Sequence, residues 1–235
     1  MMIRVPNAAG SDMAAYLATP KAAKGAGVVV LQEIFGVNES MRKACDFLAS
    51  RQFTVICPDL FWSVEPGVAL AETEFEKARA LRGKMNDEKV TDDVAAAIAF
   101  LRKHPACTGA VGVVGYCWGG LISYMTAARH KPDAAVAYYG VGIEKRLDLA
   151  ANLACPLMLH YGALDQFAPP EAVTQVKTAL KDNRSVTIHE YPEGGHAFAR
   201  PGCGHYHHRS ADLADMRTLS FLVEHLIGKG KAGAI

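Results

Sequence analysis

A cysteine flanked by glycines lies between an apolar run and a helix-like run. The residues are Val113-Val114-Gly115-Tyr116-Cys117-Trp118-Gly119-Gly120. This pattern is typical of a nucleophile elbow, in which a tight strand-to-helix turn strains the middle residue and the flanking glycines avoid clashes with the strand and the helix. Such a turn would place the thiol above the carboxyl edge of a sheet. From there, a thiolate at Cys117 could attack an acyl carbon.

A nucleophilic thiol needs a base and an acid, which elbow hydrolases carry later in the chain, after late strands. Asp165 follows the apolar run 156–161, and His196 follows the run 186–191 on a glycine-rich loop. Taken alone, Asp165 would be an Asx turn or a helix cap, and a lone loop histidine is more often solvent-exposed. Because all three residues occur in the required order, we predict that His196 accepts the thiol proton or stabilises the thiolate, while Asp165 orients the imidazole.

The negative oxygen formed during such an attack needs two hydrogen-bond donors. The N–H of Trp118, directly after the nucleophile, is the first expected donor. The second should come from the loop after an early strand, where Gln32-Glu33-Ile34-Phe35-Gly36 stands. We expect the N–H of Ile34 to supply it.

Short β-branched runs alternate with amphipathic stretches along the chain. This alternation predicts an α/β fold with a mostly parallel central sheet and helices on both faces. The expected strands are 27–31, 53–57, 110–115, 134–139, 156–161 and 186–191, and the expected helices are 39–51, 92–103, 119–130, 170–181 and 210–226. Region 63–90 is longer than a plain crossover, and a cap beside the site and a solvated helix in a long connection are equally favoured there.

Composition limits the partners. A chain of 235 residues is expected to form one domain, 1–235, and a formal net charge of +1 favours neither nucleic acid nor an anionic membrane, so the partner should be a small molecule. No apolar stretch approaches a membrane span, and the start lacks the charged and apolar regions of a signal peptide. Six scattered cysteines without a CxxC pair fit reduced thiols in the cytoplasm. Without a sign of a large exposed apolar surface, a monomer is expected.

Several further segments give the chain a family resemblance. It resembles the dienelactone hydrolase (carboxymethylenebutenolidase) family of the α/β-hydrolase fold. The matching segments are Gln32 to Gly36, Pro58-Asp59-Leu60, Gly115 to Gly120, Tyr138-Tyr139-Gly140-Val141-Gly142, Asp165-Gln166-Phe167-Ala168-Pro169 and Gly195-His196-Ala197-Phe198-Ala199-Arg200. Most elbow hydrolases carry serine as the nucleophile, so the cysteine makes the resemblance specific.

The resemblance implies hydrolysis of an enol-lactone that bears a carboxylate, such as dienelactone to maleylacetate, without a metal or other cofactor. Cys117, Asp165 and His196 take the triad positions. Glu33 takes the position of a glutamate that contacts the resting thiol and is displaced when the substrate arrives, which helps to generate the thiolate. Arg200 matches an arginine that pairs with the substrate carboxylate. Tyr139 and Phe35 are expected beside the substrate, although a tyrosine at a strand end is equally often part of the core.

Two positions depart from the family pattern. In an ungapped alignment, a second carboxylate-binding arginine of the family falls at Phe75, with Arg79 and Arg82 nearby. Either a neighbouring arginine substitutes for it, or Arg200 holds the carboxylate alone, or the substrate differs. Ala197 stands where a serine is often seen, which removes a hydroxyl beside the base.

Three other functions stay open. A broader carboxylesterase would use the same triad. A metal protein could use the run Cys203-Gly204-His205-Tyr206-His207-His208, although adjacent ligands on a glycine-rich loop rarely converge on one ion. A redox-sensing thiol protein would need a resolving cysteine, which no spacing identifies.

Overall fold

The protein is described by a computed structural model that covers residues 1–21 and 24–227. In these residues, eight strands form one sheet in the order β1-β2-β4-β3-β5-β6-β7-β8. β1 pairs with β2, and β2 with β4, in antiparallel register, and the other neighbouring strands are parallel. The strands are β1 (Met2–Pro6), β2 (Asp12–Ala18), β3 (Gly25–Leu31), β4 (Thr54–Pro58), β5 (Cys107–Tyr116), β6 (Ala134–Tyr138), β7 (Leu157–Gly162) and β8 (Val186–Tyr191).

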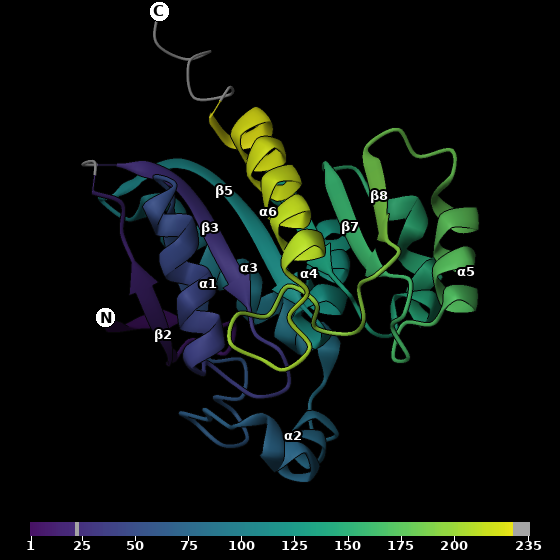
Figure 1. The fold of residues 1–235 in the computed structure, drawn as a ribbon. Coiled ribbons are helices and arrows are strands. Elements are labelled where there is room, and N and C mark those ends of the chain that lie inside the picture. Colours follow the sequence, from purple (N-terminus) through teal and green to yellow (C-terminus); the bar gives the residue numbers. More distant parts are fainter. Residues whose placement is uncertain (22–23, 228–235) are drawn as a thin grey trace, which may run out of the picture.

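Helices cover both faces of this sheet, which confirms the predicted fold class (Figure 1). One face packs against α1 (Glu39–Ser50) and α6 (His208–Leu222), and the other packs against α3 (Asp87–Lys103), α4 (Trp118–Arg129) and α5 (Pro170–Leu180). The side chains of β3 are buried along its whole length. Because both faces are covered, such strands are continuously apolar rather than alternating, which made them recognisable in the sequence.

The structure differs from the sequence prediction at two places. The antiparallel hairpin of β1 and β2 was not predicted, although Met13, Ala15 and Leu17 of β2 alternate towards the core. Its signal is weak because small residues occupy half of that strand. Helix α3 begins at Asp87, five residues before the predicted start at 92. The side chain of Asn86 accepts a hydrogen bond from the N–H of Lys89 and so caps the helix there.

The long connection 63–90 contains the short 3-10 turn η1 (Glu72–Glu74) and α2 (Phe75–Arg82). Figure 1 shows α2 beyond the carboxyl ends of the central strands, outside the two helix layers. The connection 63–90 therefore extends over the sheet edge at which the elbow cysteine lies, as expected of a cap.

Two further short helical segments lie elsewhere in the chain. They are η2 (Ile143–Asn152), after β6, and η3 (Val223–Ile227), after α6.

Candidate active site

The turn from β5 to α4 has the backbone geometry of a nucleophile elbow. Cys117 has φ 54° and ψ −115°, a region that residues with a side chain rarely adopt. A Cβ on Gly115 would lie 1.8 Å from the carbonyl oxygen of Gly119, and one on Gly119 would lie 2.2 Å from that of Leu31. Only glycine fits at these positions, so the turn brings the strained cysteine to the end of the strand.

An acid and a base meet at the same edge of the sheet. Nδ1 of His196 lies 2.8 Å from Oδ2 of Asp165. The other oxygen of Asp165 accepts hydrogen bonds from the N–H groups of Phe167 (2.7 Å) and Ala168 (3.1 Å). The buried carboxylate therefore forms a local Asx-type turn and also orients the imidazole. The contacts expected from sequence for a turn-forming aspartate and for a partner of His196 therefore occur on the same side chain.

The environment of His196 favours its protonated form. Burial alone lowers the pKa of an imidazole, but the anionic forms of Cys117 and Asp165 lie against the ring. These two groups raise the pKa of His196 from its usual 6.5 to about 10. The arrangement can therefore hold a thiolate beside an imidazolium, the pairing that makes a cysteine nucleophilic near neutral pH.

Two aromatic rings fix the plane of the imidazole. Tyr139 and Phe167 meet the His196 ring edge-on, with centroids 5.1 Å and 4.8 Å away. Tyr139 is fully buried, and its hydroxyl makes no hydrogen bond within the described part of the chain. Burial raises the pKa of this phenol well above its usual value. Tyr139 is not among the residues that line the pocket, and its ring packs against those of His196 and Phe198.

The triad opens into a pocket of about 1080 Å³. Of the residues singled out from sequence, the wall contains Glu33, Ile34, Phe35, Cys117, Trp118, His196, Arg200 and, from the cap, Phe75, Arg79 and Arg82. The interpretation of region 63–90 as a cap beside the site therefore fits the structure better than that of a solvated connection. Ala197 and His205 also line the pocket, and Ala197 is buried with φ 62°, a backbone conformation that favours small or flexible residues.

The arginines of the cap occupy different surroundings. Arg79 is largely exposed and lies 3.9 Å from Glu76 on its own helix. Arg82 pairs with Asp87 at 2.7 Å and lies over the Trp118 ring, 5.0 Å from its centroid. Because the indole N–H of Trp118 also donates to Asp87, Arg82 is tied into the wall, whereas Arg79 is free to turn towards a ligand.

An ion-pair group centred on the buried Arg200 also lines the pocket. Nη1 of Arg200 donates to Oε2 of Glu33 at 2.5 Å, and Nη2 lies 2.8 Å from Oε1 of Glu72. The guanidinium also lies over the ring of Phe35, 5.3 Å from its centroid. The second oxygen of Glu33 is buried and makes no hydrogen bond within the described residues. The structure thus shows Glu33 on Arg200 and not on the thiol.

Several pocket residues were not predicted from sequence. Glu72, Lys145 and Arg146 line the pocket, the last two from η2. They are charged residues in connecting segments without a motif of their own, so only their place in the fold reveals them. With them, the pocket wall has a mixture of cationic, acidic and apolar side chains, which suits a small molecule that carries both a charge and an apolar part.

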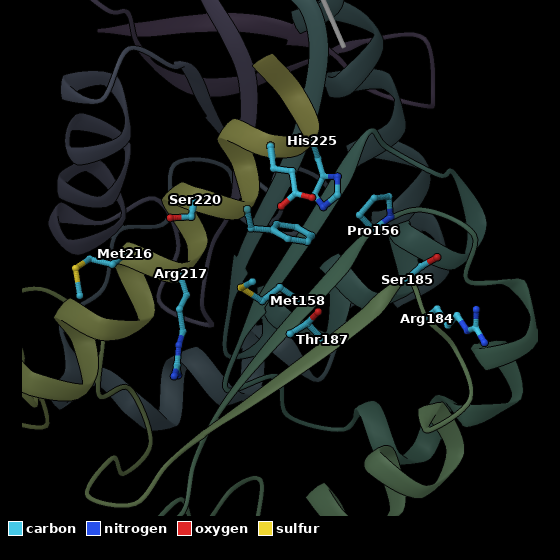
Figure 2. Close-up of a pocket in the computed structure, with 11 residues that line it drawn as sticks. Pro156, Met158, Arg184, Ser185, Thr187, Met216, Arg217, Ser220 and His225 are labelled. Atoms are coloured by element: carbon cyan, nitrogen blue, oxygen red, sulfur yellow. The ribbon is translucent and has the colours of Figure 1, made fainter. Parts of the chain in front are cut away.

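A second hollow, of about 640 Å³, lies between α6 and the amino ends of β7 and β8. Figure 2 shows Arg217 and Arg184 on opposite sides of it, with Met158 and Thr187 between them. Within the described residues, its serines and His225 make no hydrogen bond to one another. The hollow therefore lacks the convergent polar groups that the first pocket has.

The candidate metal ligands of the run 203–208 contact different parts of the protein. Sγ of Cys203 lies 3.6 Å from the carbonyl of Ala197, and His207 caps α6 through Ser210. The rings of Tyr206 and His208 pack edge-on. In the described part of the chain, no three His, Cys, Asp or Glu side chains are grouped as metal ligands.

None of the described helices is long and apolar enough to cross a membrane.

Known proteins share this arrangement. The crystal structure of "Putative Dienelactone Hydrolase" from Klebsiella pneumoniae subsp. pneumoniae superimposes with a TM-score of 0.84 at 30% identity, covering 95% of this chain and 98% of that one. A doubly covered sheet with a strained nucleophile turn and an acid–histidine pair at its carboxyl edge defines the class as α/β-hydrolase.

Sequence comparison gives the family. The profile of the Dienelactone hydrolase family matches residues 13–226. Carboxymethylenebutenolidase of Pseudomonas sp. (strain P51) is 39% identical over 217 residues, which cover 91% of this chain and 90% of the relative. The enzyme of Pseudomonas putida is 37% identical over 216 residues, covering 91% and 92%. The chain belongs to the dienelactone hydrolase family and is a carboxylic ester hydrolase of the carboxymethylenebutenolidase type.

Proposed function

We propose that the protein opens a small enol-lactone bearing a carboxylate, such as dienelactone, through a covalent thioester on Cys117. The observation that carries this proposal is the hydrogen-bonded His196–Asp165 pair, held against an elbow cysteine within one pocket. The names of the curated relatives support the same substrate class. A broader carboxylesterase is the second candidate, because Arg200 already holds two carboxylates of the protein itself.

The site accounts for each step of a lactone opening. The thiolate of Cys117 attacks the acyl carbon, and the carbonyl oxygen takes up the displaced electron pair. The backbone N–H groups of Trp118 and Ile34 are the proposed donors to that oxygen. When the oxygen re-forms its double bond, the ring C–O bond breaks and the leaving oxygen takes a proton from His196.

Water completes the cycle. His196, now neutral, removes a proton from a water molecule that attacks the thioester. The C–S bond breaks, a carboxylic acid is released, and Cys117 and His196 return to the thiolate–imidazolium pair. Asp165 keeps the imidazole in the required tautomer throughout.

Glu33 is proposed to link substrate binding to thiolate formation. One of its oxygens is bonded to Arg200, while the other is buried without a partner in the described part of the chain. A buried carboxylate oxygen of this kind can accept the thiol proton of a resting cysteine. We propose that Glu33 keeps Oε2 on Arg200 while Oε1 contacts the resting thiol of Cys117, and that a substrate acid arriving at the arginine displaces Oε1 from the thiol.

Arg200 is proposed to bind the substrate carboxylate. In Arg200→Lys, we expect KM for a carboxylate-bearing lactone to rise about tenfold or more, because an ammonium cannot present the planar set of N–H donors with which the guanidinium holds Glu33 and a second carboxylate at once. A neutral ester should lose much less. Steady-state kinetics on both substrates, with thermal melting to verify folding, measures the difference. Equal losses on both substrates would mean that the carboxylate binds elsewhere.

A trapping experiment tests the proposed function directly. An activated ester mixed with the protein and quenched in acid should leave an acyl group on the peptide that contains Cys117, seen by mass spectrometry. The adduct should be absent from Cys117→Ala protein and should decay when substrate is exhausted. Turnover without an adduct on Cys117 would contradict the covalent mechanism.

The surroundings expected in the cell follow from the same chemistry. The cysteines of the described residues are free, and a thiolate nucleophile needs a reducing compartment. We therefore propose that the enzyme works in the cytoplasm as a monomer on a small ester or lactone, without metal, cofactor or nucleic acid.

A further inference from the structure

Arg200 has more negative than positive charge around it. Its guanidinium is 6% exposed and contacts both Glu33, which is 2% exposed, and Glu72. The remaining donor, Nε, is buried and makes no hydrogen bond within the described residues. One cation therefore faces two carboxylates, and a third carboxylate from a substrate would meet like charge rather than a vacant partner.

The two carboxylates differ in how easily they can leave. Glu33 is enclosed, so removing it from Arg200 would leave a buried charge without a partner. The side chain of Glu72 is 41% exposed, so its carboxylate can exchange Arg200 for water, and exposed ion pairs contribute little stability. Glu72 is therefore the carboxylate that an incoming acid group can replace.

The backbone holds Glu72 over the arginine. The N–H of Leu70 donates to the carbonyl of Phe35 at 2.8 Å, and that of Val37 donates to the carbonyl of Val68 at 3.1 Å. This close approach requires Gly36, since a Cβ there would lie 2.0 Å from the Val68 oxygen. The turn that carries Glu72 is thus attached to the loop that carries Glu33, and its position above Arg200 is built into the fold.

We infer that Glu72 is a specificity-determining residue that occupies, on Arg200, the position of the substrate carboxylate. A carboxylate-bearing substrate binds Nη2 only by displacing Glu72, whereas a neutral ester binds without this exchange. Glu72 therefore lowers the selectivity of the site for acidic substrates. This inference rests on the proposed function, because it takes Arg200 to be the acid-binding group.

Glu72→Gln tests the inference, since it removes the charge and keeps the shape. We expect the ratio of kcat/KM for a carboxylate-bearing lactone to that for a neutral ester to rise about tenfold, mainly through KM of the acidic substrate. Glu171→Gln, which removes an exposed charge of the same sign from the first turn of α5, is the control and should keep the wild-type ratio. In an Arg200→Lys background, the gain from Glu72→Gln should shrink.

A binding measurement separates this inference from the catalytic mechanism. Succinate, titrated calorimetrically into Cys117→Ala protein, should bind about tenfold more tightly when Glu72→Gln is added. An unchanged or lower kcat/KM ratio, or unchanged succinate affinity, would overturn the role of Glu72 even if trapping succeeds on Cys117. Conversely, tighter succinate binding without an acyl adduct would retain the role of Glu72 as a carboxylate competitor and reject the covalent mechanism.

Discussion

Cys117→Ala protein is expected to hydrolyse an activated ester about 10³- to 10⁴-fold more slowly than the wild type. Removing the sulfur removes the only group that the proposal assigns to attack the acyl carbon. Hydrogen bonding to the oxyanion and substrate positioning would remain, so activity should fall to a residual level above that of water. Initial rates with a chromogenic ester at several enzyme concentrations measure the loss.

Two further variants make this result specific. Cys117→Ser should also be severely impaired, because a hydroxyl gives up its proton far less readily than a thiol and would not form the ion pair with His196. Cys107→Ala changes a free cysteine at the opposite, amino end of β5 and should retain activity within about twofold, as expected for substitutions away from the reacting groups. Equal turnover by wild type and Cys117→Ala would remove the hydrolase mechanism.

The triad was predictable because its residues follow strands. Cys117 directly follows β5, and Asp165 and His196 lie in the loops after β7 and β8; parallel strands bring their carboxyl ends to one edge. The order along the chain and the glycine spacing therefore limited the geometry before any coordinates were known. The structure adds what spacing cannot give: the hydrogen bond from His196 to Asp165 and the strained backbone of the cysteine.

The acid-binding end of the pocket was less predictable for a physical reason. Glu72 and Arg200 meet through long side chains from irregular segments, and no periodicity relates such positions. Tyr139 illustrates the same limit, because a tyrosine at a strand end can face a ligand or the core, and here it packs against His196. Local pattern thus predicted where the proposed reacting groups lie, whereas the proposed substrate-selecting groups depend on contacts between distant connections.

The proposed nucleophile, Cys117, and the proposed acid-binding residue, Arg200, are physically coupled through Glu33. The same carboxylate is bonded to Arg200 and has an unpartnered oxygen in the pocket that holds the thiol. A substrate acid that takes a place on the arginine therefore changes the electrostatic balance around the nucleophile. If Glu72 competes for that place, it influences when the thiolate becomes available as well as which substrates bind.

Asp165→Asn is expected to lower kcat by about 10³- to 10⁴-fold with little change in folding. The amide oxygen can still accept the N–H groups of Phe167 and Ala168, so the turn should persist. Its NH₂ group would then face Nδ1 of His196 and favour the tautomer with the proton on Nε2, which cannot accept a proton from the thiol. Asp182→Asn changes an exposed aspartate and is the matched control, with kcat expected within about twofold of the wild type.

The pH profile should change along with the rate. Because His196 is protonated below its pKa of about 10, the wild-type enzyme should lose activity as the pH rises through that value and the proton donor to the leaving oxygen disappears. Asp165 is one of the two anions that raise this pKa in the free enzyme, so its neutralisation should move the alkaline limb of kcat/KM to lower pH. Profiles of kcat/KM with a neutral ester, measured for both proteins, test the shift. An alkaline limb at the same pH in Asp165→Asn would mean that the carboxylate does not stabilise the imidazolium.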